Sequence, residues 1–296
     1  MEFNLNNLVR ENIKVLKPYS SARHEFTGKA SVFLDANENA FGSPLEENFN
    51  RYPDPLQWQV KFQLTRIKGV PAENIFIGNG SDEVIDLAYR IFCNPKTDNV
   101  IVCPPTYGMY QVSADINDVP VKKVPLTKDF QLDVDGILNA VDANTKLLFI
   151  CSPNNPTGNN MHRGDVETVL NNFKGIVIID EAYINYSRQK TFIQELTEYP
   201  NLIVMQTLSK AWGLAALRMG IAFASMDIID LFNKVKPPYN INEASQQLAL
   251  EGLQNTQQVN DWIKTVVHEK ENIIAGLSRL SFVKHIYPSD ANFILV

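Results

Sequence analysis

Short apolar runs recur along the middle of the chain, and segments with the apolar period of a helix separate them. The apolar runs cover 74–78, 99–103, 146–151, 175–180, 201–206 and 220–225. The segments between and around them predict helices over 57–68, 82–93, 107–117, 134–141, 163–173 and 227–235. Because the runs are continuously apolar rather than alternating, we expect both faces of the sheet to be covered. The pattern predicts an α/β fold with a mostly parallel central sheet.

The two ends of the chain have different patterns from the middle. Residues 1–50 are irregular, and we expect an amino-terminal arm that also contributes to a small domain. Residues 51–240 form the predicted large domain, which would bind the cofactor inferred below. Residues 241–296 predict long linking helices and then the start of a small α+β domain, in which HIYPSDANFILV has a strand pattern. Because this strand pattern is still in full course at Val296, we expect the small domain to be truncated at its C-terminus.

Composition narrows the class of protein. The chain has 296 residues, 45% of them hydrophobic, and its net charge of −6 is spread along the sequence, so we expect neither a nucleic acid nor a membrane as partner. No apolar run approaches the roughly 20 residues that span a bilayer. The odd cysteine count, Cys93, Cys103 and Cys151, predicts reduced thiols and a cytoplasmic location. The four histidines are scattered, so we expect no metal site.

The first predicted strand is followed by a turn that enters a helix. Gly80 and Ser81 lie in this turn, and the helix begins near Asp82. A helix N-terminus presents free N–H groups and the positive end of a dipole, which suits a phosphate. An ordinary helix cap explains the same residues, so this motif alone leaves both interpretations open.

The next strand ends are also followed by polar residues, at the edge where parallel α/β sheets bind ligands. Tyr107 could stack on a planar ligand or fill the core. The turn SPNNPTG can fix the direction of the Asn155 amide. Asp180 ends a very apolar strand, with Tyr183 three residues later, and a buried carboxylate needs a positive partner. A protonated ring nitrogen would supply that partner, although a helix-capping role remains an alternative.

The segment TLSKAWGLAALRMG places a lysine among groups that bind anions. Lys210 follows an apolar strand and lies near Thr207, Ser209 and Arg218. We expect a buried lysine whose pKa is lowered, and which would therefore form a Schiff base with a carbonyl compound. The arginine and the hydroxyls can hold a phosphate. A surface lysine beside an unrelated arginine leaves the hydroxyls and small residues unexplained. The strand ends together predict pyridoxal 5'-phosphate, a planar phosphorylated aldehyde that acts as an electron sink.

The motifs SPNNPTG, DEAY and TLSKAWGLAALRMG, in this order, resemble the fold-type I pyridoxal-phosphate aminotransferases of class II. The further motifs LDANENAFG, YPDP and GNGSDE resemble the histidinol-phosphate aminotransferase family, and the likeness runs from Leu16 to Val296. It implies an aspartate-aminotransferase-like large domain in a cytoplasmic homodimer. It also implies a two-stage transamination in histidine biosynthesis, between L-histidinol phosphate with 2-oxoglutarate and imidazole-acetol phosphate with L-glutamate.

The resemblance implies a role for each matching residue. Lys210 would bind the cofactor covalently and then move a proton, and Asp180 would keep the ring nitrogen protonated. The other cofactor contacts would be Gly80, Ser81, Asp82, Tyr107, Asn155, Tyr183, Thr207, Ser209 and Arg218, with Tyr183 also counted as catalytic. Tyr52 would reach the cofactor phosphate of a neighbouring subunit, and Tyr19 and Asn37 would lie near the substrate. The family's substrate-binding arginines would lie beyond Val296.

Three other functions remain open at this stage. A threonine-phosphate-type decarboxylase and an aromatic amino acid aminotransferase would use the same cofactor motifs. A cofactor-binding protein without turnover is disfavoured, because it has no evident need for Lys210, Asp180 and Arg218 together. A dinucleotide-binding protein is set aside, since no GxGxxG follows any of the predicted strands.

Overall fold

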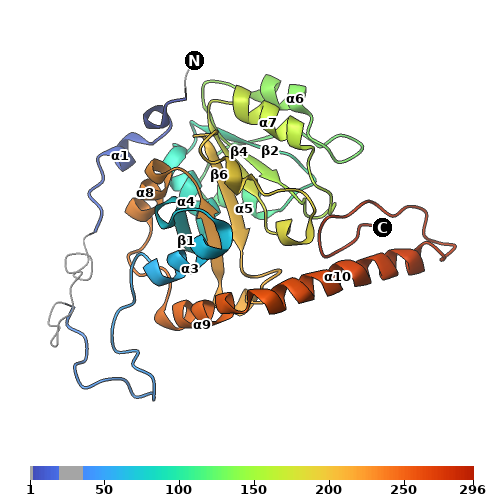
Figure 1. Ribbon diagram of the computed structural model, residues 1–296. Coiled ribbons are helices and arrows are strands. Elements are labelled where there is room, and N and C mark those ends of the chain that lie inside the picture. Colours follow the sequence, from blue (N-terminus) through green and yellow to red (C-terminus); the bar gives the residue numbers. More distant parts are fainter. Residues whose placement is uncertain (1–2, 20–35) are drawn as a thin grey trace.

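The computed structural model describes residues 3–19 and 36–296 (Figure 1). The arm predicted over 1–50 therefore lies partly outside the described residues. Its first part contains two short helices, η1 (Leu5–Asn7) and α1 (Glu11–Lys14), where the sequence predicted irregular structure. Val9 and Ile13 are buried against the body of the protein, and the Arg10 N–H donates to the Ile91 carbonyl over 3.0 Å. Helices this short form here because packing, and not helix propensity, holds them in place.

Seven strands form one mixed sheet in the order β1-β7-β6-β5-β4-β2-β3. Their bounds are β1 Ile75–Asn79, β2 Asn99–Val102, β3 Val121–Lys123, β4 Thr145–Cys151, β5 Ile176–Asp180, β6 Leu202–Thr207 and β7 Met219–Phe223. The pairs from β6 to β3 are parallel, whereas β7 is antiparallel to both β1 and β6. The predicted α/β fold with a mostly parallel sheet is confirmed. The prediction missed β3, whose three residues are too few to show a strand pattern.

The helices follow the predicted segments closely, with one difference. Their bounds are α3 Trp58–Lys68, α4 Ser81–Phe92, α5 Met109–Ile116, α6 Val134–Ala140, α7 Arg163–Asn172, α8 Met226–Val235, α9 Glu243–Gln254 and α10 Thr256–Leu277. Further short 3-10 turns are η2 Ala72–Asn74, η3 Ile184–Tyr186, η4 Phe192–Glu195 and η5 Ala215–Leu217. The long helical pattern over 242–280 is two helices, because the chain leaves helical geometry at Asn255.

Helices cover the sheet on both faces (Figure 1). Helices α4, α5 and α8 share one buried cluster with the sheet, and α3, α6, α7 and α9 share the other. Within β5, Ile176 and Ile178 belong to the first cluster, whereas Val177 and Ile179 belong to the second. All four side chains are fully buried, and each contributes about 1.5–3 kcal/mol of hydrophobic free energy. The continuous apolar run in this strand is therefore explained by helices on both sides.

The same alternation decides where polar side chains at the strand ends point. Successive side chains of a strand face opposite sides of a sheet. Asp180 is two residues after Ile178 and four after Ile176, so its side chain is on the same face of the sheet, toward the layer that contains α4 and α5. Cys151 pairs with Asp180 in the register of β4 and β5 and belongs to that same cluster. The sheet therefore gathers these groups on one face, at one edge.

The predicted strand in HIYPSDANFILV is wrong, since residues 285–296 contain no strand. The segment turns back on itself, with the Tyr287 N–H donating to the Leu295 carbonyl over 3.0 Å. The Lys270 ammonium donates to the carbonyls of Ser289 and Ala291 over 2.6 and 2.7 Å. Carbonyl groups that a strand would offer to a neighbouring strand are therefore bonded to a side chain of α10. Among the helices within 3–19 and 36–296, none is long and apolar enough to cross a membrane.

Candidate active site

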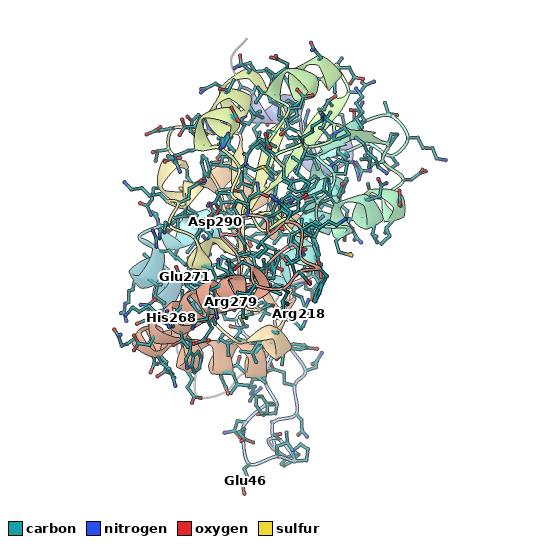
Figure 2. All side chains as sticks on the ribbon, turned by 90° about the vertical axis from the view of Figure 1, so that its right-hand side faces the viewer. Glu46, Arg218, His268, Glu271, Arg279 and Asp290 are labelled. Carbon is teal, nitrogen blue, oxygen red and sulfur yellow. The ribbon has the colours of Figure 1, made fainter. Side chains whose placement is uncertain are left out.

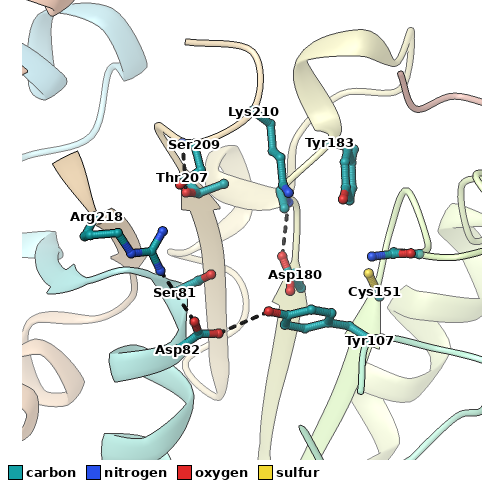
Figure 3. Close-up of a pocket in the computed structure, with 12 residues that line it drawn as sticks. Ser81, Asp82, Tyr107, Cys151, Asp180, Tyr183, Thr207, Ser209, Lys210 and Arg218 are labelled. Atoms are coloured by element: carbon teal, nitrogen blue, oxygen red, sulfur yellow. Dashed lines mark hydrogen bonds and ion pairs between the residues drawn. The ribbon is translucent and has the colours of Figure 1, made fainter. Parts of the chain in front are cut away.

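A pocket lies beyond the C-terminal ends of β4, β5 and β6, and Figure 3 shows the side chains that point into it. It is lined by Ser81, Asp82, Tyr107, Cys151, Asn155, Asp180, Ala182, Tyr183, Thr207, Ser209, Lys210 and Arg218. Ten of the residues predicted to contact the cofactor are in this set, and Gly80 lies directly beside it. Motifs that follow five strands, β1, β2, β4, β5 and β6, therefore meet at one site, although they are separated by up to about 140 positions.

One corner of the pocket is built by the start of α4 and the start of β7. Gly80 has a positive φ of +77° and its N–H donates to the Arg218 carbonyl over 2.6 Å. Gly220 is required by close approach, because a Cβ there would lie 2.2 Å from the Ser81 nitrogen. The helix N-terminus and the strand that follows Arg218 are thus pressed together. As a result, free N–H groups and a guanidinium share one corner.

Hydroxyl groups complete this corner. Thr207 ends β6, its hydroxyl donates to the Met219 carbonyl over 3.2 Å, and it accepts the Ser209 N–H over 3.1 Å. The Arg218 guanidinium lies 3.6 Å from the Asp82 carboxylate, which also accepts the Tyr107 hydroxyl over 3.2 Å. A helix N-terminus, a guanidinium and hydroxyls together form a site that fits a phosphate group.

Asp180 is a buried carboxylate on the floor of the pocket, only 4% exposed. Burial raises its pKa, because the charged form loses its hydration. Two donors favour the charged form: the Tyr110 hydroxyl at 2.8 Å from Oδ2 and the Ala182 N–H at 3.0 Å from Oδ1. The carboxylate faces the pocket, where a protonated ring nitrogen would offset the cost of burying it. The buried Asp180 carboxylate and the phosphate corner together fit pyridoxal 5'-phosphate.

Lys210 is exposed, so the prediction of a buried lysine is wrong. The strand ends at Thr207, and the three residues that follow carry the lysine beyond the sheet edge. The Lys210 ammonium still interacts with the buried Asp180 carboxylate, and its positive charge lowers the pKa of that carboxyl (Figure 3). The Lys210 Nζ lies 5.4 Å from the centre of the Tyr183 ring and points into the pocket (Figure 3). The lysine is placed to meet a ligand that enters from solvent.

Tyr110 and Cys151 also lie at this site, although neither was predicted from the sequence. Tyr110 lies on α5 and is fully buried, and burial together with the Asp180 charge raises its pKa well above the usual value. A usable signal was present, because Tyr107 and Tyr110 are three residues apart at the start of a predicted helix. Cys151 is detectable only from the strand register that sets it beside Asp180.

Besides Gly80, three predicted residues do not line the pocket. Tyr52 is half exposed and stacks on Tyr239, with the ring centres 4.5 Å apart. Asn37 lines the same separate cleft as Tyr52. Tyr19 is 75% exposed. A role for Tyr52 at a neighbouring subunit and roles for Tyr19 and Asn37 near the substrate stay predictions.

The fold and the pocket define a pyridoxal-phosphate-dependent enzyme of the α/β class. Residues 35–296 match the family model described as "Aminotransferase class I and II", and the chain belongs to that family. Its cofactor is pyridoxal 5'-phosphate, the cofactor of this family. The two rival functions that share this cofactor are not separated by the fold.

The chain is also similar to individual proteins and solved structures. The histidinol-phosphate aminotransferase of Cytophaga hutchinsonii is 54% identical over 296 residues, which cover all of this chain and 85% of that protein. The crystal structure of histidinol-phosphate aminotransferase from Sinorhizobium meliloti, in complex with pyridoxal-5'-phosphate, has a TM-score of 0.76 at 23% identity, covering 88% of this chain and 73% of that one. L-threonine-O-3-phosphate decarboxylase from Porphyromonas gingivalis has a TM-score of 0.70 at 20% identity, covering 82% and 76%.

Replacing Tyr110 by phenylalanine is expected to lower kcat/KM about tenfold. The change removes one hydrogen bond to a charged group, which contributes about 1.5–3 kcal/mol, and raises the pKa of Asp180 further. Steady-state kinetics over pH 6–9 would measure the loss. Tyr89→Phe is the matched control, since its equally buried hydroxyl donates to the Tyr110 carbonyl over 2.8 Å instead of to a carboxylate. Equal losses in the two variants would contradict a specific role for Tyr110.

Proposed function

We propose that this protein transfers an amino group between L-histidinol phosphate and 2-oxoglutarate, giving imidazole-acetol phosphate and L-glutamate, as a step of histidine biosynthesis. The observation that carries the proposal is identity over the whole chain: 54% of all 296 residues match a protein named histidinol-phosphate aminotransferase. The decarboxylase is similar only in fold, at 20% identity. Both kinds of substrate carry a phosphate, so the rival remains an outcome of the test.

The residues of the pocket would have different roles in the reaction. When bound, the cofactor would supply a ring that takes up the electron pair left at the substrate Cα. Asp180 would hold the proton at the ring nitrogen, and Tyr110 and Ala182 hold Asp180 in place with two hydrogen bonds. Lys210 would attach the cofactor and move the proton to and from Cα, because its Nζ is the only ammonium among the described residues that line the pocket.

The remaining residues would fix the cofactor in place. Ser81, Thr207, Ser209 and Arg218 would bind its phosphate at the corner described above. The Tyr107 ring would lie against the cofactor ring, and its hydrogen bond to Asp82 limits rotation of the side chain. The residues that would donate hydrogen bonds to the ring oxygen are Asn155 and Tyr183, which also line the pocket. Figure 3 shows Tyr183 on the side of the pocket away from Arg218.

A homodimer would complete the site. Tyr52 lies in a cleft apart from the pocket of its own chain, together with Asn37 and Tyr239, and its exposed edge is available to a second subunit. We place Tyr52 at the cofactor phosphate of that subunit. Dimerisation follows the family resemblance, and light scattering of the purified protein would test it. The three thiols are buried and unpaired, which agrees with a cytoplasmic location.

Absorption spectroscopy would test the proposed function. The purified protein is mixed with pyridoxal 5'-phosphate, and the visible band of the bound cofactor is recorded before and after L-histidinol phosphate is added. Formation of the band, and its loss on addition with imidazole-acetol phosphate as product, is the expected result. Release of carbon dioxide from O-phospho-L-threonine would instead favour the decarboxylase. A protein that loses the band only with aromatic amino acids would support the other aminotransferase.

A further inference from the structure

The C-terminal segment is tied to the turn that carries Asn155. The Asp290 N–H donates to the Gly158 carbonyl over 2.7 Å, and the Asn160 N–H donates to the Asp290 carboxylate over 3.0 Å. Gly158 has a φ of +84°, and a Cβ there would lie 2.7 Å from the Ser289 hydroxyl. Two reciprocal hydrogen bonds and a close approach thus fix residues 158–160 on a segment about 130 positions away.

The same segment is tied to helix α10. Lys270 is 9% exposed, and its ammonium group donates to the carbonyls of Ser289 and Ala291, on either side of Asp290. Figure 1 shows α10 extending beyond the body of the protein, with the C-terminal segment running back beside it. Asp290 lies on the side of α10 that faces the sheet (Figure 2). Lys270 therefore holds the segment against α10, while Asp290 holds it against residues 158–160.

The segment also contacts Tyr183. Ala291 is fully buried in a small cluster with Tyr183, Tyr186 and Ala211. The Phe293 ring packs edge-on against the Tyr183 ring, with centres 5.1 Å apart and an interplanar angle of 83°. Such aromatic pairs add about 0.5–1.5 kcal/mol beyond the area that they bury. Residues 289–293 therefore contact the Tyr183 ring directly, and they contact the turn that carries Asn155 through Gly158 and Asn160.

We propose that Lys270 and Asp290, which we call the latch, are positioning residues that hold Asn155 and Tyr183 in place for the cofactor. The proposal rests on the function proposed above for Asn155 and Tyr183. Neither latch residue lines the pocket, and each acts through hydrogen bonds to backbone groups. Hydrogen bonds to the ring oxygen stabilise its ionised form, so the latch would lower the pH at which the band of the bound cofactor changes.

The first measurement is amide hydrogen exchange in the cofactor-free protein. Asp290→Ala removes the acceptor of the Asn160 N–H, so exchange at Asn160 is expected to become at least about tenfold faster. Asp290→Asn keeps a side-chain oxygen that can accept this bond and is expected to exchange like the wild type. Asp133→Ala is the matched control, because its carboxylate accepts one backbone N–H, from Gly136, at the distant start of α6.

The second measurement is a pH titration of the cofactor band. Asp290→Ala and Lys270→Met are expected to raise its midpoint by about 0.5–1 pH unit, whereas Asp290→Asn stays near the wild type. Lys264 is an exposed lysine of the same helix that pairs with Asp261, and Lys264→Met should leave the midpoint unchanged. If the wild type forms the band and all variants have equal midpoints, the positioning role of the latch is wrong, while the proposed function stands. If the wild type forms no band, the proposed function fails, and the roles of Asn155 and Tyr183 fail with it.

Discussion

Replacing Lys210 by alanine is expected to abolish the covalent adduct that borohydride traps between the protein and pyridoxal 5'-phosphate. Turnover should fall by about 10⁴-fold, at the upper end of the range for a general base, because the same group attaches the cofactor and moves the proton. Lys210 is the one lysine among the described residues that line the pocket. Peptide mapping of the reduced protein would locate the label, and activity with L-histidinol phosphate would measure the loss.

Two other lysines are the alternatives that the label must be checked against. Burial lowers the pKa of Lys61 and of Lys236 to about 8, but their side chains are only 2% and 7% exposed, so we expect little labelling of either in the folded protein. Neither lines the pocket. Lys61→Met is therefore the control variant, and it should keep both the adduct and the activity. A label that remains in Lys210→Ala and maps to Lys61 or Lys236 would show that the assignment of Lys210 is mistaken.

Replacing Asp180 by asparagine is expected to preserve the adduct and to lower the rate by about 10²–10³-fold. The amide keeps the shape of the side chain but carries no charge to stabilise a proton on the ring nitrogen. Glu181→Gln is the matched control. Glu181 is the next residue, is equally buried, and also has a pKa raised by burial, but it is bonded to Gln206 and the Phe192 N–H instead of facing the pocket. A near-normal rate in Asp180→Asn would remove the electron-sink role.

The same variant should change stability in the opposite direction to activity. Burial raises the pKa of Asp180 above that of an unfolded chain, so the folded protein binds more protons between the two pKa values. The stability of the cofactor-free protein therefore falls as pH rises through this window, starting near pH 4. Asp180→Asn lacks this loss, and its Tm at pH 7 should exceed that of the wild type. Calorimetry of both cofactor-free proteins at pH 4 and pH 7 would measure the difference, which should be smaller at pH 4.

Much of the fold and of the pocket could be predicted from the sequence, because the decisive patterns are local. Continuous apolar runs gave the strands, and the residues directly after them gave the pocket. The direction of β7 could not be predicted, since an apolar run has the same composition whichever way it pairs. That direction matters, because Arg218 precedes β7 and reaches the pocket only if β7 runs opposite to β6. The sequence analysis assigned Arg218 to a phosphate site from its position near Lys210 along the chain, without predicting the direction of β7.

Other errors have a common physical cause, which is bonding between segments far apart in the chain. HIYPSDANFILV ends in the apolar run of a strand, but the Lys270 ammonium binds the carbonyls of Ser289 and Ala291. The bond between Tyr110 and Asp180 joins a helix and a strand 70 positions apart. Lys210 was expected to be buried because it follows a buried apolar strand, yet local composition does not show where a strand ends.

The order of the strands in the sheet determines when the phosphate corner can form during synthesis of the chain. β1 is made early, but its neighbour in the sheet is β7, about 140 residues later. During synthesis at about 5–20 residues per second, Ser81 leaves the ribosome many seconds before Arg218. The phosphate corner does not exist until β7 has been inserted between β1 and β6. A nascent chain can therefore bind its cofactor only after β7 has joined the sheet. Cofactor binding would then stabilise only chains whose synthesis has passed β7.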